Sequence, residues 1–266
     1  MADILPTAIE AARAAGALLR ELQARPRTID HKGVINLVTD GDRRAEALLV
    51  SLIRSRFPSH SILSEEGRNH AGPAEVCWIL DPLDGTTNFA HGFPFYSVSV
   101  AVTVRGELAA GVVYDPNRDE CFVAERGAGA RMNEAPLRVS TIADLTDALL
   151  CTGFPYDVRE APTEVVGHFQ AFLVRAQAIR RPGSAALDLA YVAAGRLDGF
   201  WEHKIHAWDL AAGALLVREA GGRVSDYAGN PLDMYRGEIL ASNGLLHEEL
   251  IRLLSAIFRP RGSPPK

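Results

Sequence analysis

The chain has 266 residues, of which 47% are hydrophobic, so it can bury a sizeable core without disulfides or a structural metal. Its 28 basic and 33 acidic residues give a net charge of -5, which provides no overall positive field for nucleic acid or anionic lipid. We therefore expect neither nucleic acid nor a membrane as a partner. A small anionic substrate would need local cations.

Cysteine usage and the N-terminal sequence predict a cytoplasmic protein. Cys77, Cys121 and Cys151 lie far apart and form no CxxC pair, which predicts reduced, buried thiols. The N-terminus has no basic stretch followed by an apolar core and a cleavage site. No apolar run approaches the ~20 residues that a membrane-spanning helix needs.

Helical spacing of apolar residues predicts a first helix from about Leu5 to Leu22. A second helix is predicted from Asp42 to Arg56, because one apolar stripe continues until Pro58 stops it. Short apolar runs separated by turn residues then predict strands of one sheet. These strands cover residues 61–63, 76–80, 97–104, 109–114 and 120–125.

Strands and helices alternate in the second half of the chain. We predict strands at residues 148–152, 178–181 and 199–202, and helices at residues 162–176, 184–194, 209–220 and 246–258. The pattern indicates two layered α+β halves, residues 1–138 and 139–258. Residues 259–266 hold prolines, a glycine and basic residues, a composition that predicts a disordered tail.

The most informative motif is Asp-Pro-Leu-Asp-Gly-Thr-Thr-Asn-Phe at residues 81–89, directly after the apolar run 76–80. The predicted strand delivers Asp81 and Asp84 to its carboxyl end, where a tight turn can point both carboxylates to one side. Hard divalent cations prefer such oxygen ligands, and the carbonyl of Leu83 can add another. Gly85 would let a substrate approach the backbone, whose N–H groups can bind a phosphate.

Other interpretations of the acidic residues have to be weighed. A bare DxxDG is more often an ordinary strand, turn and helix start, whereas the extended motif favours a metal site. Phosphatases with an aspartyl nucleophile space their acids two residues apart, and Leu83 stands where their first Asp should be. Glu65 and Glu66 alone are typical of a solvated loop, and Asp209 alone of a helix N-cap. Together these acids suit a site with two or more Mg²⁺ ions.

Several motifs together resemble the inositol monophosphatase family. The first three are Glu65-Glu66-Gly67, the run from Asp81 to Phe89, and the run from Trp208 to Gly222. Lys32, Val38-Thr39, Asp42 and residues 111–116, 153–156 and 180–188 extend the likeness, which covers about residues 5 to 255.

The resemblance implies the layered α/β sandwich of the sugar phosphatases, a fold shared by inositol monophosphatase and fructose-1,6-bisphosphatase. It also implies two to three Mg²⁺ ions. Glu65, Asp81 and the Leu83 carbonyl would bind the first, and Asp81, Asp84 and Asp209 the second. A third, weaker ion would also use Glu65, so the N-terminal half would carry most of the metal ligands.

The same resemblance implies the catalytic and substrate-binding residues. Thr86, Asp42 and Glu65 form the catalytic set, in which Thr86 and Asp42 orient and deprotonate the attacking water. The residues expected to contact substrate are Gly85, Thr86, Gly183, Ser184, Ala185, Glu202 and Asp209. Glu202 would accept hydrogen bonds from the polyol.

The implied activity is Mg²⁺-dependent hydrolysis of myo-inositol monophosphate by a lithium-sensitive, cytoplasmic homodimer. Related phosphatases act on histidinol phosphate, fructose 1,6-bisphosphate or adenosine 3′,5′-bisphosphate, and the metal ligands do not separate these substrates. A non-catalytic regulatory binding protein with the same fold is an alternative of another class. Lys204 either adds positive charge near the substrate or lies in solvent.

Overall fold

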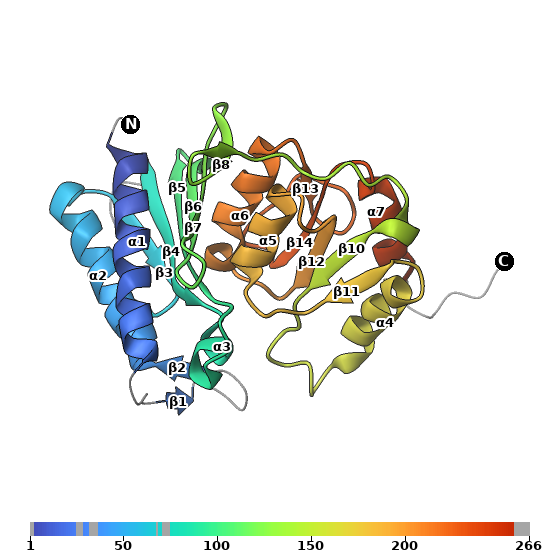
Figure 1. The fold of residues 1–266 in the computed structure, drawn as a ribbon, viewed down its shortest axis with the longest axis horizontal. Coiled ribbons are helices and arrows are strands. Elements are labelled where there is room, and N and C mark those ends of the chain that lie inside the picture. Colours follow the sequence, from blue (N-terminus) through green and yellow to red (C-terminus); the bar gives the residue numbers. More distant parts are fainter. Residues whose placement is uncertain (1–2, 25–28, 32–36, 68, 71–74, 258–266) are drawn as a thin grey trace.

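The computed structural model describes residues 3–24, 29–31, 37–67, 69–70 and 75–257 (Figure 1). Lys32 and the predicted tail 259–266 lie outside the described residues. The helices are α1 (Ile4–Gln23), α2 (Asp40–Arg56), α3 (Thr86–His91), α4 (Pro162–Leu173), α5 (Ala185–Ala193), α6 (Ala207–Glu219) and α7 (His247–Ile257), with a short 3-10 helix at Leu145–Asp147. The strands are β1 (Ile29–His31), β2 (Leu37–Thr39), β3 (Ser61–Ser64), β4 (Val76–Asp84), β5 (Ser97–Val104), β6 (Glu107–Asp115), β7 (Glu120–Glu125), β8 (Gly129–Met132), β9 (Ala135–Pro136), β10 (Leu149–Thr152), β11 (Ala178–Arg180), β12 (Gly199–His203), β13 (Arg223–Ser225) and β14 (Glu238–Ser242).

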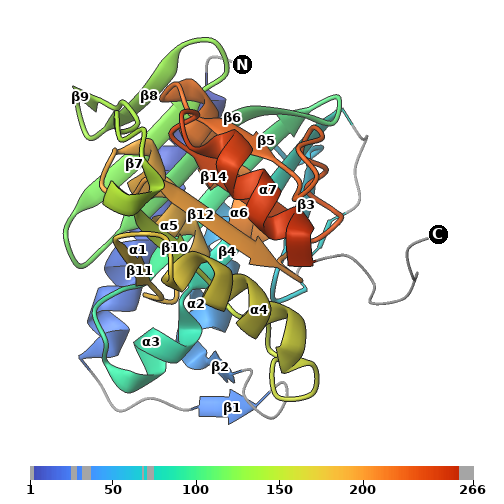
Figure 2. The ribbon, with the colours of Figure 1, turned by 90° about the vertical axis from the view of Figure 1, so that its right-hand side faces the viewer.

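Two large sheets alternate with pairs of helices. Strands β3 to β9 form a seven-stranded sheet in sequence order, and the five-stranded sheet has the order β11-β10-β12-β14-β13. In Figure 1, α1 and α2 cover the outer face of the first sheet, and α5 and α6 lie between the two sheets. Figure 2 shows α4 and α7 on the outer face of the second sheet. The predicted layered α/β sandwich is therefore confirmed.

Alternating side chains explain why both faces of each sheet are covered. Trp78 and Leu80 of β4 belong to the core beneath α1 and α2, whereas Ile79 between them belongs to the core between the sheets. In β12, Phe200 faces that same central core and Trp201 faces the opposite one. Because both faces are buried, these strands read in the sequence as continuous apolar runs.

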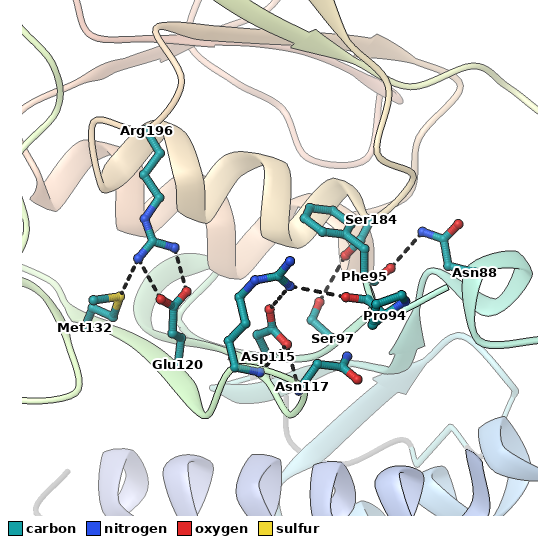
Figure 3. Close-up of polar contacts among 11 residues, drawn as sticks. Asn88, Pro94, Phe95, Ser97, Asp115, Asn117, Glu120, Met132, Ser184 and Arg196 are labelled. Carbon is teal, nitrogen blue, oxygen red and sulfur yellow. Dashed lines mark hydrogen bonds and ion pairs between the residues drawn. The ribbon is translucent and has the colours of Figure 1, made fainter. Parts of the chain in front are cut away.

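Polar contacts also join the first sheet to the residues on either side of α5 (Figure 3). Arg196, which follows α5, donates two hydrogen bonds to the Glu120 carboxylate of β7, at 2.6 and 2.7 Å. The hydroxyls of Ser97 in β5 and Ser184 at the start of α5 lie 3.2 Å apart. The division at residues 138 and 139 stays a prediction, because the central core draws side chains from both halves.

The predicted start of the second helix at Asp42 is wrong by two residues. Thr39 caps α2 by accepting a hydrogen bond from the Gly41 N–H at 3.1 Å. Asp42 in turn accepts one from the Thr39 N–H at 2.7 Å, which completes a capping box. Asp42 is therefore the third residue of the helix, and its carboxylate points back toward the helix entrance.

Strands β8, β9, β13 and β14 and the β1-β2 hairpin were not predicted. Most are two to four residues long, too short for a period-2 pattern to show. The predicted helices and strands otherwise exist with ends shifted by a few residues, and Phe258 of the last predicted helix lies outside the described residues.

All three cysteines are free thiols; Cys121 and Cys151 are buried as predicted, but Cys77 is only partly buried. Among the residues that the structure describes, no helix combines the length and apolar character needed to cross a bilayer.

Candidate active site

A cavity of about 280 Å³ opens where segments of both halves meet. Its walls come from the ends of β4, β10 and β12 and from the entrances of α3, α5 and α6. Pockets at the carboxyl ends of strands are the usual binding places of α/β proteins. The lining includes the expected site residues Glu65, Asp84, Gly85, Thr86, Gly183, Ser184, Ala185, Glu202 and Asp209.

Asp81 and Asp84 lie on one strand that changes register between them. Asp81 pairs with Ser99 of β5 and Asp84 with Ser97, so an extra residue is accommodated on β4. The Leu83 N–H donates a hydrogen bond of 3.0 Å to Asp81 Oδ1. The prediction of a tight turn between the two residues is wrong, because the strand continues through Asp84. The irregularity in the strand nevertheless brings both carboxylates to one side.

Asp84 is bound by the entrance of α5. Ser184 Oγ and the Ala186 N–H donate hydrogen bonds to its Oδ2 at 2.5 and 2.8 Å. The Ala185 N–H donates a further one to Oδ1 at 3.2 Å. Unpaired N–H groups at the start of a helix favour a negative charge. A carboxylate from the first sheet is thus fixed by a helix of the other half.

Asp209 is not the N-cap of its helix, contrary to the simplest reading of the sequence. Helix α6 begins at Ala207 after the cap residue His206. Asp209 is the third helical residue, and its Oδ2 accepts a hydrogen bond of 2.7 Å from the His206 N–H. This bond turns the carboxylate back toward the helix entrance, where the cavity lies.

Asp81, Asp84 and Asp209 each offer an oxygen atom within 4.8 Å of the other two. Burial, together with repulsion from Glu65 and the other two aspartates, raises the pKa of Asp81 well above its ordinary value. Burial and repulsion from Glu65 likewise raise the pKa of Asp209. Among the ion pairs of the described residues, none involves these three carboxylates. An all-oxygen, strongly acidic donor set of this kind fits hard divalent cations.

A hydroxyl and a buried carboxylate lie beside this cluster. Thr86 Oγ1 lies 2.9 Å from Asp42 Oδ1 and 3.1 Å from the Leu83 carbonyl oxygen, so its single proton can be donated to either. Burial raises the pKa of Asp42, although hydrogen bonds from Thr39 and Thr86 oppose the shift. A carboxylate with a raised pKa accepts a proton readily, and this pair can therefore act as a proton relay.

Comparison with known proteins now decides the family. Residues 1–258 match the model of the inositol monophosphatase family. This chain belongs to the inositol monophosphatase family. The three-aspartate cluster fits the metal-dependent phosphatase chemistry of that family.

Relatives and a solved structure agree with this assignment. Inositol-1-monophosphatase from Synechocystis is 46% identical over 95% of this chain and 88% of its own length. The protein named Nus factor SuhB from Escherichia coli is 45% identical over 91% of this chain and 92% of its own. The structure of inositol monophosphatase from Anabaena superposes with a TM-score of 0.87, at 44% identity and 95% coverage of both chains.

Glu65, another expected metal ligand, lines the same cavity but is not part of the three-aspartate cluster. It follows β3 in a turn, its N–H donates to the Leu80 carbonyl at 3.2 Å, and its side chain lines the cavity. It is close enough to repel Asp81 and Asp209, yet it is outside the cluster of three.

One further part of the cavity lining was given no role from the sequence. Residues 153–156 and Arg181 line it, and the Arg181 guanidinium lies 5.6 Å from the centre of the Phe154 ring. Lys204 also lines the cavity and pairs with Asp157, so its charge is partly compensated. Tyr156 lines the cavity too; although the residue is 57% exposed, desolvation of its phenol and repulsion from Glu65 raise its pKa. The family resemblance covers residues 153–156, but their position in the cavity depends on the pairing of strands that are distant in the sequence.

Proposed function

We propose that this protein hydrolyses myo-inositol monophosphate to inositol and phosphate, with two to three Mg²⁺ ions. One observation carries the proposal: three carboxylates have oxygens within 4.8 Å of one another, and two of them, Asp84 and Asp209, line a cavity of about 280 Å³. The Thr86 and Asp42 pair beside them supports it. So does the name of the Synechocystis relative, an inositol-1-monophosphatase.

Asp81, Asp84, Asp209 and Glu65, with the Leu83 carbonyl, would hold the metal ions. Bound there, such ions neutralise phosphate charge and lower the pKa of water. The charge that the four acids share then becomes favourable, because like charges in a buried site need a cation. The protein's own contribution is to hold these oxygens in place before the ions arrive.

Thr86 and Asp42 would activate the attacking water. As the water oxygen bonds to phosphorus, its proton passes to Thr86 Oγ1, and the Thr86 proton passes to Asp42 Oδ1, 2.9 Å away. The ester bond to the polyol oxygen breaks on the opposite side, and that oxygen takes a proton from solvent water as inositol leaves. Asp42 then returns its proton to solvent, which restores the starting state. No phosphorylated enzyme is formed.

Gly183, Ser184, Ala185 and Glu202 would contact the leaving polyol. Ser184 Oγ already donates its proton to Asp84, so toward a substrate hydroxyl it acts as an acceptor. The Ala185 N–H is likewise engaged with Asp84. Glu202 also lines the cavity, where its carboxyl group would accept hydrogen bonds from the polyol.

The test is phosphate release by purified protein from inositol 1-phosphate with Mg²⁺, with and without a chelator. Histidinol phosphate, fructose 1,6-bisphosphate and adenosine 3′,5′-bisphosphate complete the panel. We expect the highest kcat/KM for inositol 1-phosphate, no turnover with chelator, and inhibition by lithium. A higher kcat/KM for another ester would show that this ester, and not inositol 1-phosphate, is the preferred substrate. Sedimentation would test the expected homodimer.

A regulatory binding role is the second candidate, because curated relatives at 45% identity carry the name Nus factor SuhB. Inactivity of the folded, Mg²⁺-loaded protein on every ester would favour it over hydrolysis. Turnover that the chelator abolishes would instead make a purely non-catalytic role untenable.

A further inference from the structure

The carboxylate of Glu202 rests against a glycine. A Cβ atom placed on Gly153 would lie 2.1 Å from Glu202 Oε2 and 2.2 Å from both Cδ and Oε1. Real Cβ atoms essentially never approach other atoms within 3.0 Å. A side chain at position 153 and the Glu202 carboxylate in its present position therefore exclude one another.

Strand pairing explains why these two residues meet. Strands β10 and β12 run parallel, with Cys151 opposite Phe200 and Thr152 opposite Trp201. Gly153 directly follows the last residue of β10, and Glu202 follows Trp201 on β12, so by alternation they share the face of Cys151 and Phe200. That face looks into the central layer, and both Gly153 and Glu202 line the cavity there.

Little else fixes the Glu202 carboxylate. Among the described residues, no hydrogen bond or ion pair reaches it, and Arg181 acts on it only at longer range. Burial raises the pKa of Glu202 to about 8, so at neutral pH the carboxyl group can donate as well as accept hydrogen bonds. Its position is set by the space that Gly153 leaves free.

We propose that Gly153 is a specificity-determining position, which seats the Glu202 carboxylate against the end of β10 and keeps the cavity open for a ring-shaped polyol. This inference rests on the proposed function insofar as Glu202 contacts the leaving polyol. The carboxylate is the far end of a flexible side chain, so an alanine at position 153 displaces it into the cavity without disturbing the fold. The kcat/KM for an ester with a bulky hydroxylated leaving group then falls, whereas that for an ester with a small leaving group does not.

The experiment is a double-mutant cycle with two substrates. Gly153→Ala, Glu202→Ala and the double variant are compared on inositol 1-phosphate and on ethylene glycol monophosphate, a two-carbon ester. We expect Gly153→Ala to lower kcat/KM for inositol 1-phosphate about 10-fold, mainly through KM, since one pocket contact is worth about that much. The two-carbon ester should change less than about 2-fold, and in the Glu202→Ala background Gly153→Ala should add less than about 2-fold.

Two outcomes would overturn the inference. One is an equal loss on both esters, and the other is a loss that persists undiminished without Glu202, because either would place the effect in the backbone or the chemistry. If the wild type hydrolyses the two-carbon ester but not inositol 1-phosphate, the substrate proposal fails separately. A crystal structure of Gly153→Ala then decides: a displaced Glu202 carboxylate supports the inference, and an unmoved one with a shifted β10 contradicts it.

Discussion

The carboxylates in two parts of the cavity are held in place in different ways, one set by hydrogen bonds and the other by packing. On the aspartate wall, each carboxylate accepts hydrogen bonds that fix its direction. The donors are the entrance of α5 for Asp84, the His206 N–H for Asp209 and the Leu83 N–H for Asp81. Elsewhere in the lining, Glu202 receives no hydrogen bond from the described residues, and the space left by Gly153 sets its position. Under the proposed function, the groups that perform the chemistry are therefore rigidly held, whereas substrate choice depends on packing that one methyl group can change.

Removing a carboxylate from the rigid wall should have the largest effect. We expect Asp81→Asn to lower kcat/KM at least about 1,000-fold, because loss of one preorganised charged group costs on the order of 100- to 1,000-fold and metal affinity falls as well. Phosphate release and calorimetric titration with Mg²⁺ measure both. Asp233→Asn, an exposed aspartate paired with Arg236, is the matched control. Unchanged turnover in Asp81→Asn would remove the aspartate wall from the mechanism.

Acid should lower the free energy of unfolding through His247, the first residue of α7. Its ring nitrogens lie 2.9 Å from the hydroxyls of Ser225 and Ser242, and burial lowers its pKa from 6.5 to about 4. Between those values the unfolded chain binds one proton more, so the free energy of unfolding falls as pH falls, by up to about 3 kcal/mol.

Urea unfolding at pH 7.5 and pH 5 measures this loss. The His247→Gln variant should be less stable at pH 7.5 but should lose less on acidification than the wild type. Substitution of the exposed His91 in the same way is the control. Parallel pH dependences of His247→Gln and wild type would show that acid acts elsewhere.

The Thr86 hydroxyl tests the proton relay on the rigid wall. Thr86→Ala should lower kcat about 100-fold, within the range for a general acid–base group, and leave Mg²⁺ affinity nearly unchanged. Thr86→Ser keeps a hydroxyl and should retain most of the activity. Equal activity of the alanine and serine variants would exclude a relay through this atom.

A smaller effect is expected from the donor that orients Asp84. Ser184→Ala removes the 2.5 Å hydrogen bond and should weaken Mg²⁺ binding about 10-fold, as is typical when a partner of a metal ligand is lost. Ser55→Ala removes a hydroxyl that donates to a carbonyl on the exposed face of α2 and should change nothing. If both variants bind Mg²⁺ equally, the backbone N–H groups of α5 suffice to hold Asp84.

The aspartate wall could be predicted in outline from the sequence, because Asp81 and Asp84 follow a strong apolar run within one short motif. The true position of Asp209 in its helix could not, since it depends on where α6 begins. The role of Gly153 was hidden for another reason: it arises from the pairing of β10 with β12, whose residues are 49 positions apart in the chain, as Thr152 and Trp201 are. Local patterns carry no information about such a pair.

The short strands were the other part of the fold that could not be predicted from the sequence. Strand β13 has three residues, and its place at a sheet edge is decided by pairing with β14 rather than by any period of its own. The layered architecture was nevertheless predictable, because long helices and buried strands leave strong patterns.

Asp84 lies on the first sheet, but three of its four hydrogen-bond donors and its partner Asp209 come from residues 184–209. A nascent chain that has emerged from the ribosome only as far as β11 therefore holds Asp84 without the donors of α5 that orient it, and without Asp209 beside it. Under the proposed function, phosphate cleavage becomes possible only after α6 has been synthesised and docked. Enzymatic competence would then arrive late in translation, and truncated products of this gene would be inert toward cellular phosphate esters.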